Sequence, residues 1–312
     1  IYFSRFVNLS SKSVQHIICL GHGPIPPVFS IPQSIAHIPE KIHILYGNQK
    51  GGFLSLSTVL KVSGVSYSYH TLSGETPALS NITFSVPEGE FLAIVGPSGC
   101  GKSTLLSMIA SLMEPESGTI SIHGAPASMS RQRIGYMLQK DHLFEWRTIY
   151  KNVILGLEIQ NRMTEKNLEH VEQLLRDYGL DQFRNARPSE LSGGMRQRAA
   201  LIRTLALNPD LLLLDEPFSA LDYQTRLQVC DDVYRIIRKE KKTIILVTHD
   251  LSEAISMADR VLILSRRPAT VQEIVSIHFA DSGLLPMERR QASEFKQYFN
   301  EIWKELNVHG SP

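Results

Sequence analysis

The feature that most constrains this chain is a glycine-rich loop between two apolar runs. Its sequence has the spacing G-x-x-x-x-G-K-[ST] and reads Gly96-Pro97-Ser98-Gly99-Cys100-Gly101-Lys102-Ser103-Thr104. Residues 91–95 before it are typical of a buried strand, and residues 105–110 after it are typical of a helix. In that context the backbone N–H groups and the helix N-terminus bind an anion. The loop therefore predicts a nucleotide phosphate site, with Lys102 at the β- and γ-phosphates and the Ser103 hydroxyl on Mg²⁺.

Composition excludes several other classes. The 312 residues are 43% hydrophobic and 20% charged, which is ordinary for a globular protein, and the net charge of +1 predicts no nucleic-acid partner. No apolar run approaches the roughly 20 residues that a membrane-spanning helix needs, so any membrane role depends on another chain. Cys19, Cys100 and Cys230 have neither metal nor disulfide spacing, which favours a reducing, cytoplasmic compartment. Cys100 is interpreted as a small residue that fits the loop.

Residues 1–58 do not resemble a folded domain. They contain isolated apolar residues between prolines, without helical or strand periodicity and without the pattern of a secretory signal. We expect this stretch to be poorly ordered, and two interpretations remain open. It is either a genuine extension that packs on the core or an untranslated stretch, because residues 50–52 are what a ribosome-binding site encodes when read in frame. Initiation at Leu54, Leu56 or Val59 fits the second interpretation.

A second glycine motif lies further along the chain. Ser192, Gly193 and Gly194 open a helix that continues through residues 199–202. A serine and two glycines at a helix start provide either a second anion-binding N-terminus or a simple helix cap. The motif alone does not decide between them.

Two apolar runs end in polar side chains suited to phosphate chemistry. Residues 211–214 are all leucine and precede Asp215 and Glu216, and residues 243–247 precede Thr248 and His249. Such runs are typical of buried parallel strands, whose carboxyl ends lie where ligands bind in open α/β sheets. Asp215 is a candidate Mg²⁺ ligand and Glu216 a candidate general base for the attacking water. His249 is a candidate γ-phosphate contact, with a structural role as the alternative.

In this order the motifs make the chain similar to the ATP-binding-cassette (ABC) ATPases, over residues 60–267. The resemblance implies an α/β fold of the P-loop NTPase class: an ABC cassette with a RecA-like core, an antiparallel β subdomain and a helical subdomain. The ATPase domain is expected at residues 59–290, with the helical subdomain at about 140–205. A C-terminal helix and tail are expected at residues 291–312.

The resemblance also implies the ligands and the roles of the site residues. Two cassettes bind two MgATP head to tail, each ATP lying between one subunit's phosphate loop and the partner's Ser192–Gly194 helix. Asp222 then crosses the dimer interface, and Gln139 senses Mg²⁺ and the attacking water. Lys102, Glu216 and His249 are the expected catalytic residues, and Mg²⁺ is expected at Ser103, Gln139 and Asp215. Tyr69 is expected to stack on adenine, with Tyr67 as the alternative.

Residues 137–149 and 259–268 resemble the ATPases of nitrate, sulfonate and taurine importers, whose solutes are small anions or zwitterions. The resemblance implies a permease, an extracytoplasmic solute-binding protein and a position at the cytoplasmic face of the cell membrane. A coupling helix of the permease is expected in the groove after Gln139. Phe144 and Trp146 are candidates for its wall, with ordinary core packing as the alternative. About 60 residues follow His249, so no long C-terminal regulatory domain is expected.

Other functions remain as alternatives. Related importers carry thiamine-precursor pyrimidines or riboflavin precursors, and an exporter subunit would use the same chemistry. Soluble cassette ATPases that act on DNA or ribosomes usually have two cassettes, coiled-coil insertions or basic arms, none of which this sequence contains. A binding module without turnover conflicts with the presence of both Glu216 and His249.

Overall fold

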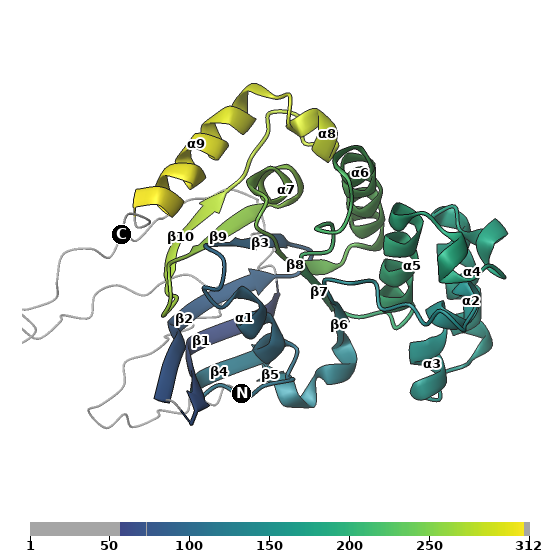
Figure 1. Ribbon diagram of the computed structural model, residues 1–312, viewed down its shortest axis with the longest axis horizontal. Helices are drawn as coiled ribbons and strands as arrows, with labels where there is room; N and C mark the ends of the chain where they lie inside the picture. The colour runs from purple at the N-terminus through teal and green to yellow at the C-terminus, as the bar shows by residue number, and fades with distance from the viewer. Residues whose placement is uncertain (1–56, 73, 309–312) are drawn as a thin grey trace, which may run out of the picture. The chain divides into compact units, whose positions relative to one another are not determined.

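The computed structural model describes residues 57–72 and 74–308 (Figure 1). The two interpretations of residues 1–58 therefore lie almost wholly outside the described residues. Strand β1 begins at Thr58, one residue before the expected start of the ATPase domain.

The centre of the described fold is a six-stranded sheet in the order β10-β9-β3-β8-β7-β6. Its strands are β3 (Phe91–Val95), β6 (Ile134–Met137), β7 (Leu211–Asp215), β8 (Thr243–Val247), β9 (Arg260–Leu264) and β10 (Val271–Ser276). Neighbouring strands pair in parallel except β10, which is antiparallel to β9. All residues of β3, β7 and β8 are buried, because helices or a second sheet cover both faces of a parallel sheet.

A second, antiparallel sheet has the order β2-β1-β4-β5. It consists of β1 (Thr58–Thr71), β2 (Gly74–Pro87), β4 (Ser117–Ile122) and β5 (Ala125–Pro126). Helix α1 (Lys102–Ile109) shares one hydrophobic cluster with this sheet and with one face of the central sheet. The side chains of β3 alternate between the two clusters, with Leu92 and Ile94 on the α1 side and Ala93 and Val95 on the other, as strand geometry requires. Because α1 follows β3 directly, this packing fixes the loop between them.

A helical segment follows β6. It contains α2 (Ile149–Val153), α3 (Leu155–Ile159), α4 (Glu165–Asp177) and α5 (Gly193–Leu205), and α6 (Tyr223–Glu240) comes after β7. Figure 1 shows α2 to α5 grouped together at the right of the view. The apolar face of α4 buries Val171, Leu174 and Leu175 in the larger hydrophobic cluster. Short 3₁₀ turns occupy 127–129, 131–133, 181–183 and 188–190.

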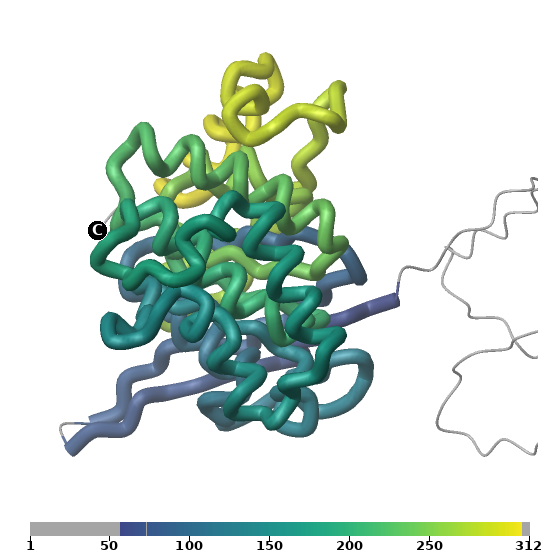
Figure 2. The backbone as a smooth tube through the Cα atoms, turned by 90° about the vertical axis from the view of Figure 1, so that its right-hand side faces the viewer, coloured from purple at the N-terminus to yellow at the C-terminus, as the bar shows by residue number. Residues whose placement is uncertain are grey.

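The C-terminal segment consists of α7 (Leu251–Met257), α8 (Pro286–Arg289) and α9 (Ser293–Val308). Figure 2 shows α8 and α9, in yellow, at the opposite end of the view from the β1–β2 hairpin. Helix α9 contacts α7 and buries Ile302 in the larger cluster. Among the residues that the structure describes, no helix combines the length and the apolar character needed to cross a bilayer.

Candidate functional site

The glycine-rich loop after β3 is wrapped around the Lys102 ammonium group. Gly99 (φ 72°) and Gly101 (φ 120°) have backbone conformations that other residues rarely adopt. A Cβ atom at Gly101 would lie 2.8 Å from Leu79 Cδ2, so glycine is also required there for space. Lys102 is buried, and its Nζ donates to the carbonyl oxygens of Gly96 (2.8 Å) and Pro97 (3.0 Å). A buried cation in a glycine-rich loop at the start of a helix suits a bound phosphate.

Cys100 lies on the inner side of the same loop. The side chain is buried, and a Cβ atom at Gly96 would lie 3.0 Å from its Sγ. Burial raises the pKa of the Cys100 thiol, and the nearby Lys102 charge opposes that shift. The thiol is therefore mostly protonated at neutral pH and fits the expectation of a small residue that fills the loop.

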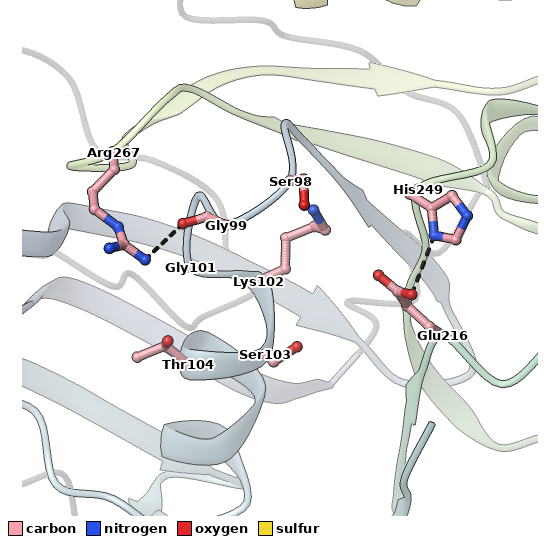
Figure 3. Close-up of a pocket in the computed structure, with 9 residues that line it drawn as sticks. All are labelled: Ser98, Gly99, Gly101, Lys102, Ser103, Thr104, Glu216, His249 and Arg267. Atoms are coloured by element: carbon pink, nitrogen blue, oxygen red, sulfur yellow. Dashed lines mark hydrogen bonds and ion pairs between the residues drawn. The ribbon is translucent and has the colours of Figure 1, made fainter. Parts of the chain in front are cut away.

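The loop forms one wall of a pocket of about 520 Å³. The loop, the end of β7, the end of β8 and the turn after β9 provide its lining, namely Ser98, Gly99, Gly101, Lys102, Ser103, Thr104, Glu216, His249 and Arg267. Figure 3 shows Lys102 between Arg267 on one side and Glu216 with His249 on the other. The pocket thus brings together the three residues predicted to be catalytic.

Oxygen ligands suitable for Mg²⁺ lie at Ser103, which lines the pocket, and at Asp215, to which Ser103 is hydrogen-bonded. The Ser103 hydroxyl donates to Asp215 Oδ1 (3.2 Å), and the Tyr136 hydroxyl donates to Asp215 Oδ2 (3.3 Å). Burial raises the pKa of Asp215, and the two hydroxyl groups oppose that shift. Burial and the Asp215 charge raise the pKa of Tyr136 to about 12, so its phenol stays a donor. A serine hydroxyl beside a carboxylate is a donor set that Mg²⁺ accepts.

Glu216 contacts two residues that follow other strands, Gln139 after β6 and His249 after β8. Its Oε2 accepts a hydrogen bond from Gln139 Nε2 (3.2 Å) and lies 3.2 Å from His249 Nδ1. The Gln139 amide also donates to Ser219 Oγ (3.4 Å). Glu216 has a φ of 45°, which is uncommon for a residue with a side chain and is concentrated at functional sites. The carboxylate therefore has a defined position at the edge of the pocket, suited to polarising a water molecule.

Tyr69 contacts the phosphate loop directly. Its hydroxyl shares a hydrogen bond with Thr104 Oγ1 (2.8 Å), and the ring is 36% exposed. Tyr67 packs edge-on against Tyr69, with ring centroids 5.1 Å apart, and also contacts the hydrophobic cluster around α1. The geometry therefore favours Tyr69 over Tyr67 as the aromatic residue at the nucleotide.

The second glycine motif lies away from the pocket of its own chain. None of Ser192, Gly193, Gly194 and Asp222 lines it. Ser192 caps α5 by accepting from Met195 N (3.4 Å), and Asp222 caps α6 by accepting from Thr225 N (3.1 Å). The hydrogen bond from Thr225 lowers the pKa of Asp222. Within one chain these residues are helix caps, so a role at phosphate requires a second copy.

The glycines of this motif also have a packing role. A Cβ atom at Gly194 would lie 3.0 Å from Val229 Cγ2 and 3.1 Å from Thr225 Cγ2, both on α6. Glycine at this position lets α5 approach α6 closely.

Arg226 links the loop after β7 to the loop after β8. Its guanidinium donates to the Leu221 carbonyl oxygen (3.1 Å) and to Asp250 Oδ2 (3.4 Å). Asp250 follows His249 in the chain and caps α7. The turn at residues 219–222 is thereby connected to the backbone that carries His249.

The aromatic turn after Gln139 is stabilised by one buried amide. Asn152 accepts from Phe144 N (2.7 Å), and its Nδ2 donates to the carbonyl oxygens of Phe144, Arg147 and Thr148. This turn presents Trp146, which is 73% exposed, and Phe144, which is 37% exposed, with ring centroids 4.7 Å apart. Core packing is therefore the wrong explanation for Trp146.

Three residues of the site were not identified from the sequence. Arg267 lines the pocket, Tyr136 supports Asp215, and Asn152 holds the aromatic turn. The position of Tyr136, one strand away from Asp215 in the sheet, follows only once the strand order is known. The two arginines before Pro268 were the available signal for Arg267.

Comparison with known proteins identifies the family. A family model described as "ABC transporter" matches residues 79–219. An uncharacterized ABC transporter ATP-binding protein of Bacillus subtilis, YtlC, is 47% identical over 248 residues, which is 80% of this chain and 95% of that protein. The nitrate import ATP-binding protein NrtD of Synechocystis is 40% identical over 73% of this chain and 88% of its own length. The taurine import ATP-binding protein TauB of Pelagibacter ubique is 39% identical over 69% and 82%.

Solved structures give the same fold. The chain is similar to MJ0796, solved as the dimer of a bacterial ABC transporter cassette, with a TM-score of 0.61 and 30% identity. The match covers 70% of this chain and 99% of MJ0796. MJ0796 has also been solved as a dimer in a post-hydrolysis state with ADP and Pi. The expected cassette fold and family resemblance are thus confirmed. The chain belongs to the ABC transporter family, as an ATP-binding protein related to those of nitrate and taurine importers, and is an ATPase coupled to transport.

Proposed function

We propose that this chain is the ATP-hydrolysing subunit of an importer for a small anionic or zwitterionic solute. The observation that carries the proposal is the meeting of Lys102, Glu216 and His249 in one pocket. Two relatives, the nitrate import protein NrtD and the taurine import protein TauB, are named for the import of such solutes. The solute passes through a separate permease, and the energy comes from MgATP.

In this proposal the triphosphate lies in the loop, with its γ-phosphate toward Glu216 and His249. Lys102 moves from the Gly96 and Pro97 carbonyl oxygens to the phosphate oxygens. Ser103 and Asp215 hold Mg²⁺, with Gln139 as the further candidate, and Mg²⁺ neutralises phosphate charge. Glu216 accepts a proton from the attacking water, and His249 donates to the γ-phosphate.

The proposed active unit is a head-to-tail homodimer. Ser192, Gly193 and Gly194 of one subunit cap the phosphate in the partner's loop, and Asp222 lies at the interface. The separation of these residues from the pocket within one chain supports this arrangement, as does the dimeric structure of MJ0796. Closing the dimer around two MgATP and reopening it after hydrolysis moves the permease.

The exposed aromatic turn is the proposed contact with the permease. Phe144 and Trp146 present apolar surface in the turn that follows Gln139, and Leu138, immediately before Gln139 in the chain, is 44% exposed. Exposed apolar side chains in a group are typical of protein interaction sites. A coupling helix packed there senses Gln139 and, through it, Glu216. The proposed location is the cytoplasmic face of the cell membrane, with a solute-binding protein on the other side.

The experiment is a pull-down of the tagged full chain from native membranes, followed by mass spectrometry. Trp146→Glu is the test variant, and Trp303→Glu on α9 is the matched control because Trp303 is also exposed, at 56%. We expect a permease to copurify with the wild type and with Trp303→Glu, and to be lost with Trp146→Glu.

Other results separate the alternatives. A copurifying solute-binding protein supports import, and the ligand that this protein binds identifies the solute class, including thiamine or riboflavin precursors. A membrane partner with the features of an exporter contradicts the direction of transport. Recovery with ribosomes or nucleic-acid enzymes, or with no membrane protein, contradicts the transport role itself.

A further inference from the structure

Arg267 lies in the nucleotide pocket but belongs to none of the motifs identified from the sequence. It lies in the turn between β9 and β10, and its guanidinium NH₂ donates to the Gly99 carbonyl oxygen (2.8 Å). The residue is exposed and lines the pocket together with Lys102 and Thr104. Figure 3 shows it beyond the phosphate loop, on the side away from Glu216 and His249.

The fold does not need Arg267 to hold its turn in place. The turn is fixed by backbone hydrogen bonds from Ala269 N to Ala78 O (2.9 Å), from Ser80 N to Ala269 O (2.8 Å) and from Ser265 N to Thr270 O (3.0 Å). A guanidinium has five N–H donors, and the bond to Gly99 uses one of them. Four donors remain, and Arg267 lines the pocket.

The arrangement of the other residues indicates which part of a nucleotide reaches Arg267. Glu216 and His249 are at the hydrolytic end, where the γ-phosphate belongs, and Lys102 is in the middle. A nucleotide with its phosphates in this order has its nucleoside toward the opposite end. Thr104 lies there with Tyr69 hydrogen-bonded to it.

We propose that Arg267 is a nucleotide-binding residue that contacts the base and ribose of ATP, in addition to Tyr69. A guanidinium stacks on the face of a base and donates to ribose oxygens and to the ring nitrogens of adenine, whereas an aromatic ring alone supplies only stacking. The inference rests on the proposed position of ATP in the phosphate loop. It adds a second residue for recognition of the nucleoside.

The test measures the Kd of three ligands, MgATP, MgADP and Mg-tripolyphosphate, by calorimetry or by displacement of a fluorescent nucleotide. Tripolyphosphate carries the phosphates without base or ribose. The full-length proteins are the wild type, Arg267→Ala and the neighbouring control Arg266→Ala, each checked by thermal melting. The Kd of CTP is measured as well, because a pyrimidine offers less stacking area than adenine.

For Arg267→Ala we expect the Kd values of ATP and ADP to rise by about tenfold, the loss typical of one stacking contact. The Kd of tripolyphosphate should stay within about twofold, and the preference for ATP over CTP should shrink. Arg266→Ala should match the wild type. An equal loss for all ligands would assign Arg267 to holding the Gly99 loop, and no loss at all would remove it from the site; either result overturns the inference.

The position of ATP is tested separately in the same assay. Lys102→Ala should weaken ATP and tripolyphosphate together. If it weakens neither, the proposed phosphate site is contradicted, independently of what Arg267 does.

Discussion

Glu216 Oε2 and His249 Nδ1 lie 3.2 Å apart, although they follow different strands of the central sheet. Gln139, which follows a third strand, donates from its Nε2 to the same oxygen. Glu216, the proposed general base, therefore links His249, the proposed γ-phosphate contact, to Gln139, which lies next to the proposed permease surface. In the proposed function, a movement of the Gln139 segment shifts this carboxylate and so connects transport with hydrolysis.

His249→Ala should lower kcat much more than ATP affinity. The histidine is 59% exposed in the single chain, and its proposed contact with phosphate is needed in the transition state rather than for binding. We expect kcat to fall by about 100-fold or more, with the Kd of MgATP nearly unchanged. Steady-state hydrolysis and equilibrium binding measure the two effects, and exposed His278→Ala is the control. An equal loss in kcat and affinity would assign His249 to ground-state binding.

Ser192→Arg should block closure of the dimer by placing bulk and charge against the partner's phosphate. Ser192→Ala is the matched control, because it removes the same helix cap, at a cost of about 1 kcal/mol, without adding bulk. Size-exclusion chromatography in saturating MgATP gives the readout, with a dimer expected for Ser192→Ala and a monomer for Ser192→Arg. A normal ATP-dependent dimer of Ser192→Arg would contradict the head-to-tail arrangement.

Gly194→Ala should destabilise the fold where Gly193→Ala does not. A methyl group at position 194 meets Val229 and Thr225 of α6 at 3.0 and 3.1 Å, whereas at position 193 it meets Leu221 Cδ2 at 3.2 Å. Replacing glycine by alanine at either site stabilises the helix by about 1 kcal/mol. Overpacking opposes this gain and destabilises the fold by about 1–3 kcal/mol. Urea unfolding should therefore place Gly194→Ala about 1 kcal/mol or more below Gly193→Ala. Equal stabilities would show that α5 can move away from α6 without cost.

Cys100 should react slowly with iodoacetamide at neutral pH. Burial raises the pKa of its thiol above the ordinary value, and only the thiolate reacts. The thiolate fraction and the rate should increase with pH through and beyond pH 9, and MgATP should slow the reaction because the thiol lies in the phosphate loop. A Cys19→Ser, Cys230→Ser background makes the label specific. Rapid modification at pH 7, unaffected by MgATP, would contradict the buried position.

Much of the fold could be predicted because local signals and tertiary structure agree. Residues 211–214 are apolar at every position because β7 is buried on both faces. The phosphate loop was predictable for a similar reason, since its glycines, its lysine and the strand and helix beside it are contiguous in sequence. These features depend on neighbours in the chain rather than on long-range packing.

The contacts that complete the site depend on strand order, which local sequence does not encode. Gln139 and Glu216 are far apart in sequence and meet because β6 pairs with β7. Arg267 reaches Gly99 because β9 lies beside β3. The sequence alone did not show whether Trp146 is exposed or packed in the core. Its exposure results from the buried amide of Asn152, which fixes the turn.

The most direct test of the account is the oligomeric state of Glu216→Gln in saturating MgATP, measured by size-exclusion chromatography with light scattering. Glutamine keeps the shape of the side chain and removes its basicity, so ATP should bind without being hydrolysed. The account predicts a stable dimer of twice the chain mass in MgATP and a monomer in MgADP. Addition of Ser192→Arg to the same chain should abolish the dimer. A Glu216→Gln protein that binds MgATP and remains monomeric would contradict both the role of Glu216 and the ATP-bridged dimer.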